Sequence, residues 1–344
     1  MEIVLRLPMA PIKRKGLFAS RPTIYISIIL SVILVAYAYR LRTDTIFSCQ
    51  AHWYSTDRYL AQCGGMSYGD YDHGALLFGL EPTAQEFAKN ADVLFLGNSR
   101  LQVAFSTMGT ADWFSAASAR YYLLGFGYFE NMIFAEQLLR RLHPQARVYV
   151  INVDDFFEGS ETAIAKTLFH DPDARNRYEW KRFWQRVHEP VCKTFAPLCG
   201  HNYWVFRSRE TGAYTGAYTV ETDKHRITGR WREGMTPVSY DWVISQDVVN
   251  NYTASATNFL SHLAVEPKCV ILTMVPTVGT KIGNTNAIAN ALGVSLVTPE
   301  ILAGLQTTDG SHLDHASAER WSQAFYQVAG SRIRSCLEKG AAHS

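Results

Sequence analysis

A serine, an aspartate and a histidine are spaced so that they could form one nucleophilic site. Ser99 follows the apolar run 91–96 almost directly, and Asp309 lies three residues before His312 on a glycine-containing turn. A serine hydroxyl is a weak nucleophile until a histidine takes its proton. A carboxylate on the other imidazole nitrogen fixes the tautomer that can do so. These residue types therefore indicate acyl-transfer chemistry, with Ser99 as nucleophile, His312 as base and Asp309 as orienting residue.

Each part of this constellation also has an ordinary structural interpretation. A serine after a strand is often a helix cap, and Asp-Gly is common in surface turns. Asp314 and His315 form a second acid–histidine pair, but adjacent side chains diverge, so this pair is not expected to act together. The relative order of the parts along the chain carries more weight than any one of them.

Short apolar runs alternating with amphipathic segments must position these residues. Runs of this kind predict buried strands joined by helices, which is typical of an α/β domain with a mostly parallel sheet. Functional sites in such sheets lie at the carboxyl ends of the strands. The predicted strands are 91–96, 148–153, 268–275 and 293–297, and the predicted helices are 131–142, 284–292 and 316–334.

The order of three blocks resembles the SGNH/GDSL hydrolase superfamily. Gly97-Asn98-Ser99 resembles its GDS block, Asp309 to His312 resembles its DxxH block, and Gly125 or Gly127 falls where its glycine block belongs. The resemblance covers roughly residues 90–335. It implies a flavodoxin-like three-layer α/β/α fold with a mostly parallel sheet. It also implies ester hydrolysis or acyl transfer through an acyl-serine, without a cofactor.

The sequence departs from the superfamily at the block that normally supplies an asparagine to the oxyanion hole. The corresponding segment, 151–157, has Asp154 at that position, and an ionised carboxylate can only accept hydrogen bonds. Asn152 could substitute as the donor. The resemblance otherwise assigns the oxyanion hole to backbone N–H groups of Ser99 and Gly127, with Gly125 as the alternative. Substrate binding is assigned to Asp154 and Arg100, the latter for an anionic sugar or else in a structural role.

The N-terminal apolar segment bears on the compartment. Residues 23–39 carry no charge and are about long enough to span a bilayer. Five basic residues precede the segment, against two that follow closely, which predicts a cytoplasmic tail 1–22 and an external C-terminal part. A cleaved signal peptide is the competing interpretation, because Ala36-Tyr37-Ala38 resembles a cleavage site. A buried helix of a soluble protein is a third.

All six cysteines lie beyond this segment, as expected of disulfides formed in an oxidising compartment. Connectivity does not follow from sequence alone, although the spacings favour two local loops and a remaining pair. No Cys/His spacing matches a zinc site, and no metal is predicted. The favoured pairs are Cys49–Cys63, Cys192–Cys199 and Cys269–Cys336.

The predicted organisation has one large domain behind a membrane anchor. A stalk at 40–90 leads into the domain at 91–335, which carries an insertion of helices and loops at about 158–245, and a tail follows at 336–344. The net charge of +2 gives no basic field for nucleic acid.

The predicted function is that of a single-pass inner (plasma) membrane protein with a periplasmic or otherwise extracytoplasmic domain. The domain would be a serine esterase or O-acyltransferase for acyl groups, with acetyl favoured, of an envelope or exported glycan or of an acylated small molecule. The chain resembles the D-alanyl transfer proteins of teichoic acid and the alginate O-acetylation proteins, which implies a multi-span membrane acyltransferase as partner. The alternatives are a non-catalytic glycan-binding or assembly subunit that keeps the fold, and a lipase or thioesterase.

Overall fold

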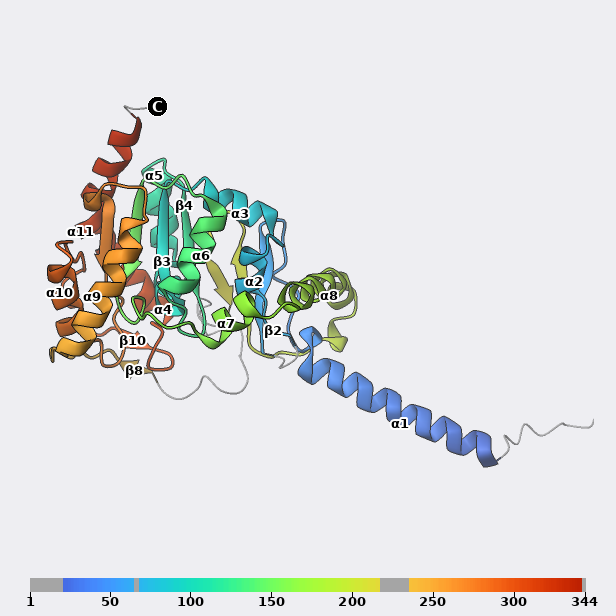
Figure 1. Ribbon diagram of the computed structural model, residues 1–344. Helices are drawn as coiled ribbons and strands as arrows, with labels where there is room; N and C mark the ends of the chain where they lie inside the picture. Colours follow the sequence, from blue (N-terminus) through green and yellow to red (C-terminus); the bar gives the residue numbers. More distant parts are fainter. Residues whose placement is uncertain (1–20, 65–67, 217–234, 342–344) are drawn as a thin grey trace, which may run out of the picture. The chain divides into compact units, whose positions relative to one another are not determined.

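The computed structural model describes residues 21–64, 68–216 and 235–341 (Figure 1). The chain divides into two units, which meet after Leu41. The first contains most of helix α1 (Arg21–Asp44), whose residues 22–40 are exposed. At 1.5 Å per residue this helix is roughly 35 Å long, enough for the ~30 Å hydrocarbon layer of a bilayer. Within the described ranges it is the one helix long and apolar enough to cross a membrane. The predicted tail 1–22 lies almost entirely outside them.

A parallel four-stranded sheet forms the centre of the second unit. Its strands are buried at every position, as expected when both faces of a sheet are covered. The spatial order is β4-β3-β5-β9, and an isolated parallel bridge between Leu272 and Leu296 continues it beyond β9. The α/β class and the parallel sheet are therefore confirmed. The strands are β3 (Val93–Asn98), β4 (Tyr121–Phe126), β5 (Val148–Asn152) and β9 (Val270–Thr273).

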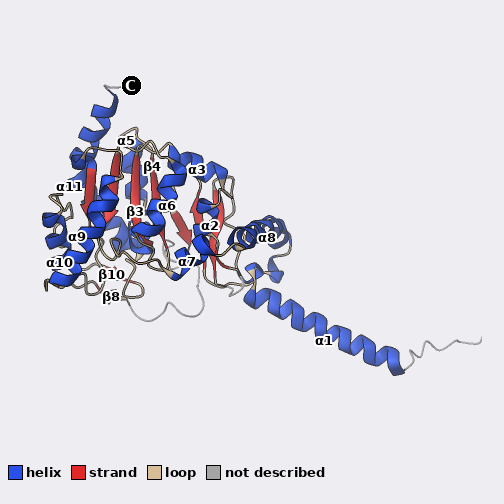
Figure 2. Ribbon diagram, in the orientation of Figure 1, coloured by secondary structure: helices blue, strands red, loops and turns tan. Residues whose placement is uncertain are grey.

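Helices cover both faces of this sheet (Figure 2). Alternate residues of β3 belong to different cores: Leu94 and Leu96 pack with one set of helices, Val93 and Phe95 with the other. This follows from the strand geometry, in which successive side chains point to opposite faces. The first set is α6 (Met132–Leu142), α9 (Gln246–Ser261) and α10 (Ile282–Ala291), and the second is α4 (Ser99–Phe105), α5 (Met108–Ala116) and α11 (His315–Ala341).

The segment predicted to be a stalk differs from that expectation, because it folds into the second unit. Strand β1 pairs antiparallel with β6, about 145 residues later, in a sheet of order β2-β1-β6-β7. The predicted insertion therefore contributes strands as well as helices, in addition to its residues 217–234, which lie outside the described ranges. The elements concerned are β1 (Arg58–Cys63), β2 (Gly69–Asp70), α2 (Asp72–Leu77), α3 (Pro82–Lys89), α7 (Ala163–His170), α8 (Ala174–Thr194), β6 (Trp204–Ser208) and β7 (Tyr214–Gly216).

Three smaller differences concern the predicted elements. Strand β4 was not predicted, the strand predicted at 293–297 is reduced to the bridge at Leu296, and the C-terminal tail is helical up to Ala341. The remaining elements are single turns or two-residue pairs. They are η1 (Ile46–Ser48), η2 (Ala196–Leu198), η3 (Pro267–Cys269), β8 (Thr236–Pro237) and β10 (Gln306–Thr307).

All six cysteines form disulfides, and the pairs are the three favoured from the spacings. Cys49–Cys63 joins η1 to β1, and Cys192–Cys199 closes the corner between α8 and η2. Cys269–Cys336 ties the start of β9 to the last helix over 67 residues. The pairing prediction is confirmed.

Replacing Cys269 and Cys336 by serine should lower the free energy of unfolding by about 4 kcal/mol, because the reduced chain gains the entropy of a long open loop. The pair Cys192–Cys199, with a separation of 7, is the matched control and should cost about 2 kcal/mol. Urea denaturation of the detergent-solubilised protein, followed by circular dichroism, measures both. An equal or larger loss for the short loop would contradict the expectation.

Candidate active site

Ser99 lies at the junction of the first strand and the first helix of the parallel sheet. Asn98 ends β3, and its side-chain oxygen accepts a hydrogen bond from the N–H of Arg100 at 3.0 Å, so Asn98 is the N-cap of α4. Ser99 is therefore the first residue of the helix rather than its cap. This position carries its hydroxyl to the carboxyl edge of the sheet, where the ends of parallel strands meet.

The predicted serine, histidine and aspartate come together there. The hydroxyl oxygen of Ser99 lies 2.8 Å from Nε2 of His312, and Nδ1 of His312 lies 2.7 Å from Oδ2 of Asp309. The two members from the C-terminal turn lie 210 and 213 residues from the serine in sequence. Their contact geometry is that of a nucleophile, a base and an orienting carboxylate.

The turn that carries the acid and the base is held by its own backbone. The second carboxylate oxygen of Asp309 accepts hydrogen bonds from the N–H groups of Ser311 and His312, at 2.9 and 2.7 Å. Gly310 has φ of +81°, a conformation that favours glycine. Burial alone would raise the pKa of the Asp309 carboxyl, but these hydrogen bonds and that from the imidazole outweigh it and lower the pKa. The lowered pKa favours the ionised carboxylate beside the imidazole.

The neighbouring pair has a different role, as expected. Asp314 accepts a hydrogen bond from the N–H of Ser317 at 2.7 Å, which places its carboxylate at the start of α11. His315 is the first residue of that helix.

A network of polar contacts fixes the residues on both sides of Ser99. One oxygen of Asp154 accepts hydrogen bonds from the side-chain nitrogen of Asn98 at 2.9 Å and from Arg100 at 3.1 Å. Arg100 also donates to the hydroxyl of Ser311 at 3.0 Å, and so connects the end of β5 to the turn of the histidine. Burial raises the pKa of Asp154, although Arg100 acts in the opposite direction. Arg100 and Asp154 were predicted to bind substrate, and their contacts within the protein are structural.

The residues predicted to donate to an oxyanion differ in whether their N–H groups are already used within the protein. Gly125 lies inside β4, and its N–H donates to the side chain of Gln102 at 3.0 Å, so it is already used. This contact favours Gly127 over Gly125 as the backbone donor. Asn152 is fully buried: its side-chain oxygen accepts from the N–H of Val275 at 2.8 Å, and its side-chain nitrogen, the group that would donate to an oxyanion, has no hydrogen-bond partner among the described residues. Gly127 directly follows β4.

Two exposed aromatic residues after Gly127 were missed by the sequence analysis. Tyr128 and Phe129 have φ of 59° and 57°, in the left-handed region that non-glycine residues rarely adopt. The guanidinium carbon of Arg100 lies 5.7 Å from the centre of the Phe129 ring. Strained backbone of this kind concentrates at functional sites. The residue types do not predict this backbone conformation, because tyrosine and phenylalanine rarely adopt a positive φ.

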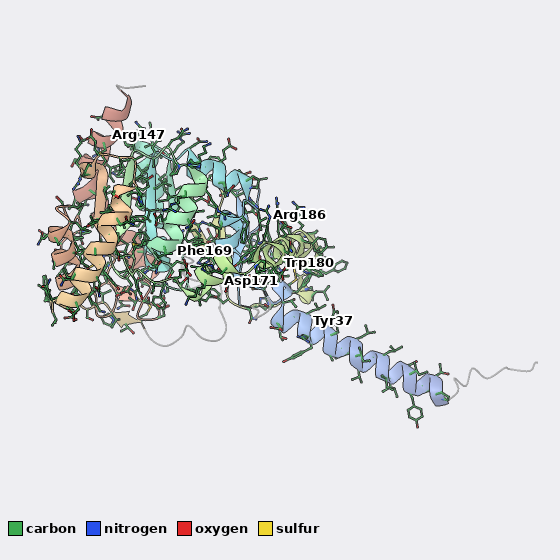
Figure 3. All side chains as sticks on the ribbon, in the orientation of Figure 1. Tyr37, Arg147, Phe169, Asp171, Trp180 and Arg186 are labelled. Atoms are coloured by element: carbon green, nitrogen blue, oxygen red, sulfur yellow. A yellow bond between two sulfur atoms is a disulfide. The ribbon has the colours of Figure 1, made fainter. Side chains whose placement is uncertain are left out.

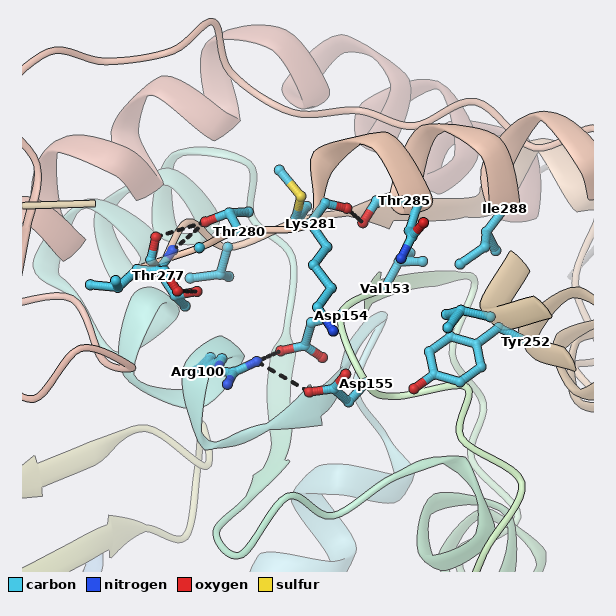
Figure 4. Close-up of a pocket in the computed structure, with 16 residues that line it drawn as sticks. Arg100, Val153, Asp154, Asp155, Tyr252, Thr277, Thr280, Lys281, Thr285 and Ile288 are labelled. Atoms are coloured by element: carbon cyan, nitrogen blue, oxygen red, sulfur yellow. Dashed lines mark hydrogen bonds and ion pairs between the residues drawn. The ribbon is translucent and has the colours of Figure 1, made fainter. Parts of the chain in front are cut away.

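A pocket of about 250 Å³ opens beside the network, bounded by Arg100, by the segments that follow β5 and β9, and by α9 and α10 (Figure 4). Val278 lines it and donates its N–H to the carbonyl of Gly310 at 3.0 Å, which joins the pocket wall to the histidine turn. Lys281 points into it toward Asp154 and Asp155 (Figure 4). The polar and aromatic lining other than Arg100 and Asp154 was not predicted, because its parts lie far apart in sequence. It includes Asp155, Tyr252, Thr277, Thr280, Lys281 and Asn284.

One group of potential metal ligands occurs among the described residues, formed by His188, Cys192 and Cys199. The two sulfur atoms are joined in a disulfide and are not thiolates. Burial lowers the pKa of His188 to about 4, and its nitrogens contact the hydroxyl of Tyr54 and the carbonyl of Cys49. This histidine is therefore a neutral part of the core.

Replacing Asp154 by alanine should lower kcat/KM by about a hundredfold, because both neighbours of Ser99 lose the carboxylate that positions them. Asp155→Ala is the matched control. Its carboxylate is more exposed, lies 3.5 Å from the Arg100 nitrogen and should matter far less. Ester turnover by the two variants, with thermal unfolding to check folding, measures the difference. Equal losses would argue against the positioning role.

Comparison with known proteins gives no matching family model, and no curated protein and no solved structure is significantly similar to this chain. We therefore argue function from the contacts of Ser99, Asp309 and His312, since a fold alone does not specify an activity.

Proposed function

We propose that the chain is a membrane-anchored serine esterase or O-acyltransferase that acts through an acyl-serine. The observation that carries the proposal is the 2.8 Å contact between the Ser99 hydroxyl and Nε2 of a histidine whose other nitrogen is held by Asp309. Placed at the carboxyl edge of a parallel sheet, this arrangement has the parts that nucleophilic catalysis needs.

The reaction proceeds in two halves. The Ser99 oxygen attacks the carbonyl carbon of the acyl donor while His312 takes the hydroxyl proton. The imidazolium, stabilised by Asp309, then protonates the leaving oxygen, and the acyl group remains on the serine. In the second half His312 deprotonates water or a sugar hydroxyl, whose oxygen attacks the acyl carbon. The bond between that carbon and the Ser99 oxygen breaks, the imidazolium returns its proton to the Ser99 oxygen, and the acid or the acylated sugar leaves. Backbone N–H groups of Ser99 and Gly127 are proposed to bind the oxyanion.

Membership of the SGNH superfamily is part of the proposal, and the strand order supports it. Taken with the bridge at Leu296, the order of the parallel segments is second, first, third, fourth and fifth along the chain. This is the order of flavodoxin-like sheets. The serine after the first strand and the acid–histidine turn before the last helix fit the same plan.

We further propose an extracytoplasmic glycan as substrate. The three disulfides support an oxidising compartment, and the apolar helix α1 with its preceding basic residues supports a single-pass anchor with the domain outside. The pocket offers carboxylates, hydroxyls, an amide and the ring of Tyr252, groups suited to sugar hydroxyls. A multi-span acyltransferase would supply the acyl group if the reaction is transfer.

The test is genetic, in the organism that makes the protein. Deleting the gene should change the acyl content of an exported polymer, measured by NMR of the purified polymer. A chromosomal Ser99→Ala variant, present in the membrane at the normal level, should reproduce the deletion. If that variant instead preserves normal acylation, the chain serves as a non-catalytic assembly subunit and the proposal is wrong.

A further inference from the structure

Helix α8 carries an apolar stripe that faces away from its own core. Its buried face contains Tyr178, Gln185, His188 and Cys192. Trp180, Trp184, Val187, Val191 and Phe195 repeat at intervals of three and four residues along a different side, which is the spacing of one helical face. Phe183 lies beside this stripe on α8, Phe195 is the C-cap of the helix, and Leu198 ends the following turn η2. We call Trp180, Phe183, Trp184, Phe195 and Leu198 the aromatic surface.

The five side chains of the aromatic surface are between 41% and 61% exposed. Trp180, Phe183 and Trp184 contact one another with ring centres 5.2 to 6.4 Å apart. These three rings form one contiguous cluster rather than isolated surface residues, and contiguous exposed apolar patches mark binding surfaces. The disulfide Cys192–Cys199 closes the corner that carries Phe195 and Leu198.

The position of the patch in the chain identifies what it can meet. Helix α1 ends at Asp44, and Phe47, three residues later, contacts Trp184 with ring centres 6.2 Å apart. Three residues span at most about 10 Å. The chain after η2 contacts the same segment. The N–H of Gly200 donates to the carbonyl of Phe47 at 2.8 Å, and the side-chain nitrogen of Asn202 donates to the backbone carbonyl of Thr43 at 3.4 Å. The aromatic surface is therefore fixed to the point where the chain leaves α1.

The composition around the patch matches a membrane surface. Helix α8 has six Lys or Arg residues and two Glu residues. Trp180 and Arg186 both project from it (Figure 3). Tryptophan and phenylalanine beside basic side chains are typical of helices that lie in the interface of a bilayer, with rings at the level of the headgroups. Long basic side chains there reach anionic lipid headgroups.

We propose that the aromatic surface docks on the lipid bilayer into which α1 inserts, and so holds the catalytic domain against the membrane in one orientation. The inference rests on the proposed role of α1 as an anchor. A docked domain presents its site at a fixed height and angle, which a single flexible tether would not do. A protein partner is the competing occupant, and it would leave the patch in water when the purified chain is alone in a bilayer.

The test uses the full chain in nanodiscs of phosphatidylethanolamine and phosphatidylglycerol. Because the described cysteines are all disulfide-bonded, an introduced cysteine provides a single thiol for a fluorophore. Labels are placed at Phe183→Cys and Leu198→Cys on the aromatic surface, at Ser31→Cys within α1, and at Val328→Cys on an exposed position of α11. A spin-labelled lipid with its nitroxide near the headgroups quenches any fluorophore that lies in the interface.

We expect the labels at 183 and 198 to lose about half of their emission and the label at 328 to lose almost none. If both surface labels behave like the label at 328 while the label at 31 is quenched by a lipid with a deep nitroxide, the anchor stands and the docking proposal is overturned. If the label at 31 is unquenched as well, α1 does not insert and the proposed anchor itself is wrong.

Discussion

Ser99→Ala is expected to abolish covalent labelling of the full chain by a fluorophosphonate probe and to lower ester turnover by about 10⁴-fold or more. The reason is the single contact through which the hydroxyl can lose its proton, to Nε2 of His312 at 2.8 Å. His312→Ala should cause a loss of the same order, because the three residues act as a unit. The measurements are probe labelling resolved on a gel and hydrolysis of p-nitrophenyl acetate.

The chain supplies a matched control three residues further on. His315 begins α11 beside Asp314, which accepts a hydrogen bond from Ser317, so His315→Ala should leave labelling and turnover nearly unchanged. Asp309→Asn should retain the fold and lose most activity, since an amide favours the wrong imidazole tautomer. Labelling that persists in Ser99→Ala would place the nucleophile elsewhere.

The pH dependence of stability and activity can be predicted for the Asp309 carboxylate. The pKa of Asp309 is lowered in the folded protein, so its stabilising contribution is present above the pKa of the unfolded carboxyl and is lost as pH falls through the lower folded value. We therefore expect the Asp309 carboxylate to remain ionised at mildly acidic pH, above this window, so that activity lost there does not come from its protonation. Thermal unfolding at the same pH values shows whether the fold is intact.

The serine could be predicted because it lies where a buried apolar run ends, and the acid and the histidine because they share one turn between the last predicted strand and the last helix. The carboxyl ends of parallel strands lie at one edge of the sheet. The proximity of Ser99 to the turn from Asp309 to His312 can therefore be predicted without knowing how the loops fold. Strand β4 was missed although Tyr121 to Phe126 is fully buried, because its glycine and tyrosines suggested a substrate loop. The same interpretation placed Gly125 in that loop, whereas it lies inside β4.

What sequence reasoning could not supply are contacts between distant polar segments. Strand β1 contains an arginine and a glutamine and pairs with a strand about 145 residues later, so no local pattern distinguishes it from a stalk. The same applies to Arg100, whose partners lie 54 and 211 residues away. The sequence alone does not distinguish an arginine on the surface from one, like Arg100, that connects two distant segments.

Asp72→Ala is expected to be the most destabilising single substitution outside the site, with a loss of about 3 to 5 kcal/mol. Asp72 and Arg207 form an ion pair whose side chains are both completely buried. Tyr59 and Tyr214 donate to the same carboxylate at 2.7 and 2.8 Å, and Arg207 donates to the carbonyl of Leu123 in β4. Burial alone would lower the pKa of Arg207, but the carboxylate raises it, so the guanidinium stays charged.

Removing the aspartate therefore leaves a buried cation with no counter-charge, at the point where β6 meets the parallel sheet. Glu179→Gln, which breaks the exposed pair with Arg175, is the control and should cost less than about 1 kcal/mol. A double variant, Asp72→Leu with Arg207→Met, should recover much of the loss, because an apolar pair of similar volume needs no desolvation of charge. Urea denaturation of the three variants measures this. If the double variant is no more stable than Asp72→Ala, the loss comes from packing between the two sheets and not from an uncompensated charge.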